Sequence, residues 1–193
     1  MSTPEHNSDA QDCRVGIETI YGEIVAQIYT KRAPAAARNF LHYVDEGCYQ
    51  QAAWYRAARP DNDDRQPAIS IIQGGIDPSC TSAPAWPPIP HEPTSVTGLS
   101  HCEGALSAVR WAPGTATSEF FIIVRTTREL DFGGARNPDG QGFAAFGRVV
   151  DGMEIVRYIN ALPTGTQSQI EFLQNQTLLP PVTMRIRRLA PIQ

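Results

Sequence analysis

Apolar and polar residues alternate along two neighbouring runs near the start of the chain. The runs Val15–Ile20 and Glu23–Tyr29 have the two-residue period of strands that bury one face. Tyr21 and Gly22 lie between the runs, and a two-residue connection that contains glycine is typical of a hairpin turn. The pattern therefore predicts a β-hairpin over residues 15–29.

The spacing of apolar residues changes to that of a helix in the next segment. Pro34 suits a first helical position, because its missing N–H group needs no partner there. Phe40 and Val44 are four residues apart and share one helical face, and Gly47 provides a stop. These features predict a helix over Pro34–Glu46.

A second helix is predicted after the last strongly apolar run. Met153, Val156 and Ile159 form an apolar face at helical spacing. Asp151 and Glu154 have the three-residue spacing of a capping box, in which each side chain bonds the backbone N–H group of the other residue. We therefore expect this helix to begin with Asp151 as its N-cap.

Short strand-like runs account for much of the remaining chain. Gly, Pro and Asp separate them, and many short strands with turn signals are typical of a closed barrel or a sandwich. With the hairpin they give eight strands, and two helices well separated in sequence fit a barrel whose open ends they cover. The predicted fold class is mainly β: a closed antiparallel eight-stranded barrel with two capping α-helices, closed by the last run. The runs lie at residues 54–56, 69–73, 105–109, 120–124, 143–150 and 184–189.

Two further segments are predicted to be loops. Pro60–Pro67 is polar, and Ser82–Pro93 contains five prolines and Trp86. Proline cannot donate to a sheet, so residues 82–93 cannot be a central strand. We interpret this segment as a long exposed loop, and the alternative is a polyproline stretch that binds a partner.

Composition narrows the class of protein. The chain has 193 residues, of which 41% are hydrophobic and 19% charged, and this suits one folded domain. The formal net charge is -4 and the basic residues form no stripe, so we expect no nucleic acid partner. Residues 1–12 are polar and predict a flexible tail before a domain over residues 13–193. We interpret this polar segment as a tail and not as a signal peptide, and no apolar run reaches membrane length, so we expect a cytoplasmic protein without membrane contact.

The cysteines and histidines lack the spacings of metal sites. The four cysteines form no C-x-x-C pair, so we expect reduced thiols and neither metal nor cofactor. His91, His101 and Cys102 are the nearest approach to a cluster, and a metal site there is the alternative. The sequence contains no H-E-x-x-H or G-x-S-x-G motif, which argues against a zinc or serine hydrolase.

Six motifs resemble those of the cyclophilin family in order and spacing, over about residues 15–162. The resemblance implies the family's barrel and its activity, the cis-trans isomerisation of peptide bonds that precede proline. Residues 137–150 look closest to bacterial members. The motifs are Asn39-Phe40, Trp54-Tyr55-Arg56, Ile72-Gln73-Gly74-Gly75, Gly104-Ala105-Leu106-Ser107-Ala108, Ser118-Glu119-Phe120-Phe121-Ile122, and Phe143-Ala144-Ala145-Phe146-Gly147 followed by Asp151-Gly152-Met153.

The resemblance implies three catalytic residues. Arg56 matches the family's catalytic arginine, Gln73 matches a glutamine that holds a substrate backbone group, and Phe121 is the floor of a pocket for the proline ring. Without the resemblance, Arg56 would be read as a surface arginine, Gln73 as a barrel-end hydrogen bond and Phe121 as core. The implied substrate-binding residues are Ile71, Val109, Arg110, Trp111, Glu119, Leu130 and Phe143.

The sequence departs from the family pattern at three places around the predicted groove. Glu119 replaces the usual glutamine, and its carboxylate could pair with Arg56 or weaken peptide binding. The segment 109–111 stands where the family often has A-N-A, which predicts a bulkier and positively charged rim. Glu129 replaces the tryptophan that contacts cyclosporin, so we predict weak cyclosporin binding.

The expected partners are proline-containing peptides and unfolded or flexible protein segments, bound by a monomer that assists folding. The alternative function is a catalytically weak cyclophilin-like module that binds proline-containing peptide, because Glu119 and the altered rim compromise the site.

Overall fold

The computed structural model describes residues 13–76, 86–166 and 173–190. The predicted tail, residues 1–12, and part of the predicted loop, residues 82–85, lie outside the described residues. The strands are β1 (Cys13–Thr19), β2 (Gly22–Ile28), β3 (Ala52–Ala58), β4 (Ile71–Ile76), β5 (Ala105–Ala108), β6 (Phe120–Ile123), β7 (Ala144–Asp151), β8 (Thr164–Gly165) and β9 (Thr177–Arg188). The helices are α1 (Pro34–Asp45), α2 (Thr94–Thr97) and α3 (Met153–Ala161), with short 3-10 helices η1 (Cys48–Gln51) and η2 (Arg128–Leu130).

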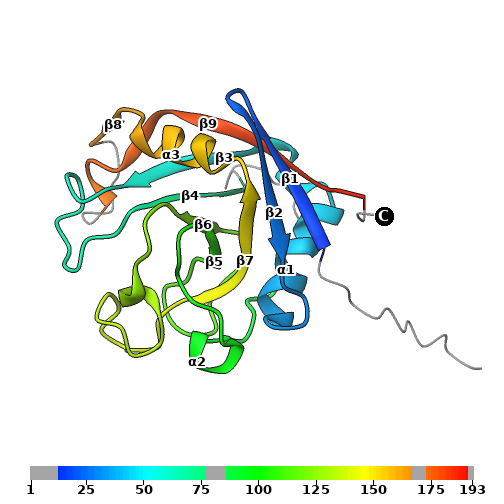
Figure 1. The fold of residues 1–193 in the computed structure, drawn as a ribbon, viewed down its shortest axis with the longest axis vertical. Coiled ribbons are helices and arrows are strands. Elements are labelled where there is room, and N and C mark those ends of the chain that lie inside the picture. Colours follow the sequence, from blue (N-terminus) through cyan, green and yellow to red (C-terminus); the bar gives the residue numbers. More distant parts are fainter. Residues whose placement is uncertain (1–12, 77–85, 167–172, 191–193) are drawn as a thin grey trace, which may run out of the picture.

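Eight of the strands close into an antiparallel barrel (Figure 1). Their order is β1-β2-β7-β5-β6-β4-β3-β9, and β9 pairs back with β1. The two-residue β8 only adds to the edge of β9. The predicted closed barrel is confirmed and the sandwich is wrong, because the ring of pairings returns to its first strand. The last predicted strand is longer than expected, and it closes the barrel by pairing with both β1 and β3.

The two predicted helices lie on opposite sides of the barrel (Figure 1). α1 packs against β7 and β9, and α3 packs against β2, β3 and β4. Phe40 and Val44 of α1 and Val156 and Ile159 of α3 are buried in these contacts, as their spacing predicts. The one-turn helix α2 was not predicted, because four residues are too few to show a helical period. No helix of the described residues is long and apolar enough to span a membrane.

The start of α3 differs from the prediction. Asp151 is the last residue of β7, and Gly152 is the N-cap with a φ of 85°. A Cβ on Gly152 would lie 2.7 Å from the backbone oxygen of Glu23, so glycine is required there. The Asp151 carboxylate accepts a hydrogen bond of 3.0 Å from the N–H group of Gly152. The predicted capping box of Asp151 and Glu154 is therefore wrong, because the strand runs directly into a glycine turn.

The proline-rich segment caps α1. The helix has no side-chain cap of its own, so its first N–H groups need partners from elsewhere. The Glu92 carboxylate accepts hydrogen bonds from the N–H groups of Ala35 (3.0 Å) and Ala36 (2.9 Å). Ile89 of the same segment is buried. The described part of the predicted exposed loop, residues 86–93, is thus attached to the barrel beside α1.

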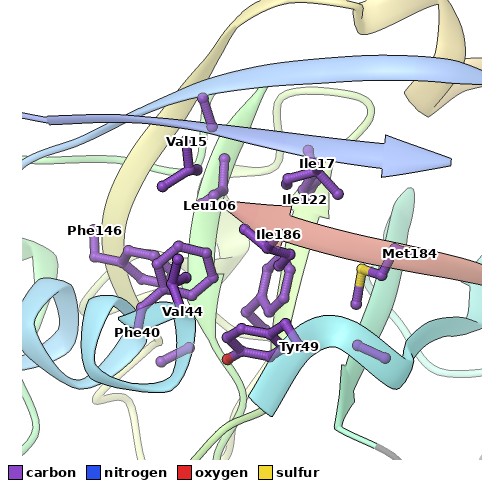
Figure 2. Close-up of a cluster of buried hydrophobic side chains, with 14 of the residues drawn as sticks. Val15, Ile17, Phe40, Val44, Tyr49, Leu106, Ile122, Phe146, Met184 and Ile186 are labelled. Atoms are coloured by element: carbon purple, nitrogen blue, oxygen red, sulfur yellow. The ribbon is translucent and has the colours of Figure 1, made fainter. Parts of the chain in front are cut away.

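Buried apolar side chains form two clusters. The larger cluster fills the barrel and its junction with α1 (Figure 2). There the ring centroid of Phe40 lies 5.5 Å from that of Tyr49 and 5.2 Å from that of Phe146. The smaller contains the alternate residues of β4 and β6, such as Phe121, and so covers the outer face of these strands. Because both faces are buried, these strands are apolar at consecutive positions. The smaller cluster comprises Ala58, Ile69, Ile71, Ala105, Phe121, Ile123 and Leu130.

Candidate active site

An irregularity in β3 places two polar side chains beside β4. Trp54 pairs with Gly74 and Arg56 pairs with Gln73, so Tyr55 is an extra residue between two successive pairs. Such a bulge changes the direction of the side chains that follow it. Trp54 is buried in the barrel, whereas Tyr55 and Arg56 both hydrogen-bond to the Gln73 side chain on the outer face.

The outer face of β3, β4 and β6 lines a cavity of about 1310 Å³. Every residue that the sequence assigned to the site lies on its wall, although the residues come from six separate segments of the chain. The cavity also contacts Tyr55, Arg65 and Arg136, which the sequence did not assign. The predicted residues on the wall are Arg56, Ile71, Gln73, Val109, Arg110, Trp111, Glu119, Phe121, Leu130 and Phe143.

Aromatic rings form the apolar part of the wall. Phe121 and Phe143 meet edge to face, with ring centroids 5.3 Å apart and planes at 89°. Leu130 and Ile71 are buried in the same cluster as Phe121. The arrangement gives a surface of carbon atoms that suits an apolar ring.

A buried hydrogen-bonded chain lies behind Phe121. The His101 ring stacks on Phe121 with centroids 6.1 Å apart, its Nδ1 donates to Asp131 Oδ1 (2.7 Å), and its Nε2 is 2.9 Å from Ser107 Oγ. Burial raises the pKa of Asp131, but the hydrogen bonds from His101 outweigh it and the net shift is downward. Ser107 is fully buried, so this Ser-His-Asp chain supports the aromatic wall and does not present a nucleophile.

The histidines of the alternative metal site have other partners. Both ring nitrogens of His101 are engaged as described above, and His91 Nε2 lies 3.0 Å from the backbone oxygen of Gln141. Cys102 Sγ lies 3.3 Å from Ser100 Oγ. Within the described ranges, no three His, Cys, Asp or Glu side chains are grouped so as to hold a metal ion.

Arg56 is held by amide oxygens. Its Nη1 donates to Gln73 Oε1 (2.7 Å) and its Nε donates to Gln176 Oε1 (2.8 Å). No carboxylate in the part of the chain that the structure describes forms an ion pair with it. Burial lowers the pKa of Arg56 to about 10, so the guanidinium stays protonated at neutral pH. With 8% of its surface exposed, it is not a surface arginine.

Two other arginines of the wall are as buried as Arg56 but are neutralised. Arg110, 7% exposed, donates to both carboxylate oxygens of Asp139 at 2.7 and 2.9 Å, and these bonds lower the pKa of Asp139. Arg136, 4% exposed, makes the same two-point contact with Asp63 at 2.9 and 3.0 Å. Asp63 belongs to the predicted polar loop 60–67, which therefore holds Arg136 in the wall of the cavity.

The rim of the cavity differs from the prediction in charge. The segment 109–111 was expected to make the rim bulky and positive. Trp111 is 72% exposed and supplies the bulk, but the Arg110 guanidinium is buried, paired with Asp139 and 5.2 Å from the Phe143 ring centroid. The predicted positive rim is therefore wrong, because Arg110 turns inward to a carboxylate.

Glu119 is bound by a phenol. Tyr55 donates its hydroxyl hydrogen to Glu119 Oε1 (2.7 Å) and accepts a hydrogen bond from Gln73 Nε2 (2.6 Å). The direct pair of Glu119 with Arg56, one of the two predicted effects, is not formed, since Tyr55 and Gln73 lie between them. Burial and the charge of Glu119 raise the pKa of Tyr55, so the phenol remains a neutral donor.

Four of the residues that shape the site were not found from the sequence: Tyr55, Asp63, Asp139 and Gln176. Gln176 is 120 residues from Arg56, and Asp63 is 73 residues from Arg136. No local motif marks such partners. The one available signal was an arginine at an otherwise apolar position, which calls for a carboxylate or an amide nearby once it is buried.

Comparison with known proteins agrees with this architecture. The family model described as cyclophilin type peptidyl-prolyl cis-trans isomerase/CLD matches residues 14–185. The chain is 33% identical over 152 residues to peptidyl-prolyl cis-trans isomerase B of Escherichia coli K12, covering 78% of this chain and 86% of that protein. It is 32% identical over 153 residues to a peptidyl-prolyl cis-trans isomerase of Acinetobacter baylyi, covering 79% of this chain and 74% of that protein.

Solved structures share the fold. A cyclophilin type peptidyl-prolyl cis-trans isomerase of Cryptosporidium parvum superposes with a TM-score of 0.69 at 20% identity, over 94% of this chain and 100% of that one. A second crystal structure of that protein, obtained in the presence of the dipeptide Ala-Pro, gives a TM-score of 0.68 over 92% of this chain and 99% of that one.

Proposed function

This chain belongs to the cyclophilin-type peptidyl-prolyl cis-trans isomerase family and has that family's activity, and we propose that it isomerises X-Pro bonds of unfolded or flexible protein segments in the cavity beside Arg56. In this proposal Arg56, Gln73 and Phe121 carry the reaction.

The reaction needs an electrostatic aid more than a nucleophile. The bond before proline has partial double-bond character, and its rotation has a barrier of about 18–20 kcal/mol. As the bond twists, resonance is lost and the prolyl nitrogen gains a localised lone pair. A donor directed at that nitrogen stabilises the twisted state more than either planar isomer, and only such differential binding accelerates a reaction.

The charge state of Arg56 is the observation that carries the proposal. Its guanidinium is buried at the cavity, protonated, and held by the oxygens of Gln73 and Gln176, which bear no net charge. Two hydrogen bonds hold the group in one orientation before substrate binds, so little reorganisation is needed when the amide twists. No carboxylate of the described residues contacts the guanidinium directly, and Asp63 acts on its charge only at longer range, so a positive charge faces the developing lone pair.

The neighbouring residues supply binding. Phe121, Phe143 and Leu130 form an apolar surface for the proline ring, and Gln73 can hold a substrate backbone group because its amide both donates and accepts. The crystal structure of the Cryptosporidium parvum relative in the presence of Ala-Pro supports a proline-containing ligand. Glu129 is exposed where the family has its cyclosporin-contacting tryptophan, so weak cyclosporin binding is part of the proposal.

Exchange NMR of a short Ala-Pro peptide tests the proposal. The native chain and Arg56→Ala are compared at equal folded concentration. The native chain should accelerate exchange, and the mutant should lose about 100- to 1000-fold in kcat/KM, the loss typical of one preorganised donor. Arg56→Lys keeps the charge but lacks the planar fork, so its kcat/KM should fall between the two.

Two results would redirect the assignment. A folded native chain that binds the peptide without accelerating exchange would favour the peptide-binding module. An Arg56→Ala chain with native kcat/KM would contradict the role of Arg56.

A further inference from the structure

We propose that the cavity contains a subsite for a cationic side chain of the substrate, a lysine or arginine within about two residues of the proline, formed by the carboxylate of Glu119 and the indole of Trp111. The inference rests on the proposed function, because it assigns a substrate preference to the same cavity.

The Glu119 carboxylate is held in one position. Oε1 accepts the hydrogen bond from Tyr55, and the side chain lies against Gly75, where an added Cβ would come within 3.0 Å of Glu119 Cγ. A larger residue at position 75 would displace Glu119, so glycine leaves room for this placement. A charge that is already ordered loses little side-chain entropy when it binds a partner.

No described residue neutralises this carboxylate. Among the described residues, no Lys, Arg or His forms an ion pair with Glu119, and its hydrogen-bond donor is a neutral phenol. The buried arginines of the same wall show the opposite arrangement, since Arg110 and Arg136 each contact a carboxylate at two points. A half-buried negative charge facing a cavity favours a cation supplied by the substrate.

The position of Glu119 places such a cation close to the reacting bond. Glu119 and Phe121 are two residues apart and face the same cavity. Two hydrogen bonds, through Tyr55, connect Glu119 to Gln73, which in turn bonds Arg56. Consecutive Cα atoms of a peptide are about 3.8 Å apart. A long side chain within two residues of the proline can therefore reach from the bond beside Arg56 to the Glu119 carboxylate.

Trp111 supplies the second element of the subsite. The N–H group of Val109 donates to the Glu119 backbone oxygen (3.0 Å), which brings the segment leading to Trp111 alongside Glu119. The Trp111 side chain lines the cavity and is 72% exposed. An indole accepts the aliphatic stem of lysine or the plane of a guanidinium on its face.

A lysine scan of a neutral proline peptide tests the subsite. Lysine is placed in turn at the two positions before and the two after proline, and each peptide is compared with norleucine at the same position, which has a similar stem without the charge. The native chain should show a Lys to norleucine ratio of kcat/KM of about five to ten at one position, the size of a half-buried ion pair. The ratio should shrink in about 0.5 M salt.

Glu119→Gln is the diagnostic variant, because it keeps the shape and an acceptor for Tyr55 while removing the charge. The ratio should fall to about one, and affinities from NMR titration should lose the same preference. Glu154→Gln, which removes an exposed carboxylate on α3 outside the cavity, should keep the native ratio.

The outcomes separate the two proposals. Equal kcat/KM for Lys and norleucine at all four positions, in a chain that turns over the neutral parent peptide, would overturn the subsite and leave the proposed function intact. A preference for lysine that persists in Glu119→Gln would also overturn it. A native chain that accelerates no peptide would contradict the proposed function, and the subsite would fall with it.

Discussion

The cavity wall holds three buried guanidinium groups, and the region around Arg56 differs from the regions around the other two in what binds the group. Around Arg110 and Arg136 the partner is a carboxylate in two-point contact. Around Arg56 the partners are two amide oxygens, from Gln73 and Gln176. The exposures of the three side chains are nearly the same, so burial alone does not distinguish them.

The difference separates a structural charge from a reactive one. A buried charge is costly unless it is paired, and a carboxylate pays that cost by cancelling the charge. An amide oxygen solvates the guanidinium through its dipole and leaves the net charge in place. Arg110 and Arg136 therefore tie neighbouring loops to one another, whereas Arg56 keeps a positive charge that a twisting peptide bond can use.

Breaking the pair of Arg136 should give the largest effect. Asp63→Asn removes the only carboxylate that contacts this arginine among the described residues, yet keeps an acceptor for the N–H group of Ile69. The free energy of unfolding should fall by about 3–5 kcal/mol, because a buried charge is left uncompensated. Urea unfolding followed by circular dichroism measures the change.

Asp64 provides the matched control, because it is the next residue and is exposed. Asp64→Asn should change the free energy of unfolding by less than about 0.5 kcal/mol. If the Asp63 and Asp64 variants have the same free energy of unfolding, Asp63 does not compensate the buried charge of Arg136.

The pair of Arg110 with Asp139 should have a smaller effect on stability, and its dependence on acid pH tests it. Hydrogen bonds from Arg110 lower the pKa of Asp139 from 3.8, so this pair stabilises the fold fully above pH 3.8 and less as pH falls through the lowered pKa. Because Asp139 is half-exposed, the contribution should be about 1 kcal/mol or less. The difference in Tm between the native chain and Asp139→Asn should be constant above the ordinary carboxyl pKa and vanish in stronger acid. A difference that persists unchanged at the lowest pH would contradict the ion pair.

The sequence predicted the barrel because its strands and helices have distinct apolar periods. The alternation in residues 15–29 and the helical spacing from Phe40 to Val44 depend only on near neighbours. The capping box at Asp151 failed for a tertiary reason, since Gly152 must pass within contact distance of Glu23. Local spacing contains no information about that approach.

Ten residues that line the cavity were assigned from the sequence, but the state of their charges was not predicted. All ten assigned residues face one cavity, which their motif positions allowed. Whether a guanidinium meets a carboxylate or an amide depends on contacts with residues far away in the sequence. The separations along the chain are 29 positions for Arg110, 73 for Arg136 and 120 for Arg56. The expected positive rim at Arg110 was wrong for this reason. The roles of Arg56, Gln73 and Phe121 in catalysis stay predictions.

Giving Arg56 the same kind of partner as Arg110 is the most direct test of the account. Gln176 is buried and lies outside the cavity wall, so Gln176→Glu places a carboxylate beside the Arg56 Nε without touching the substrate. Gln176→Met is the neutral control, because both variants lose the donor to the Asn62 backbone oxygen and to Asp63 Oδ1. The measurement is kcat/KM for an Ala-Pro peptide at equal folded concentration. The account predicts that the Glu variant is at least about tenfold slower than the Met variant, a loss of about 1.4 kcal/mol in transition-state stabilisation. Equal values for the two variants would show that the uncancelled charge of Arg56 is not what drives the reaction.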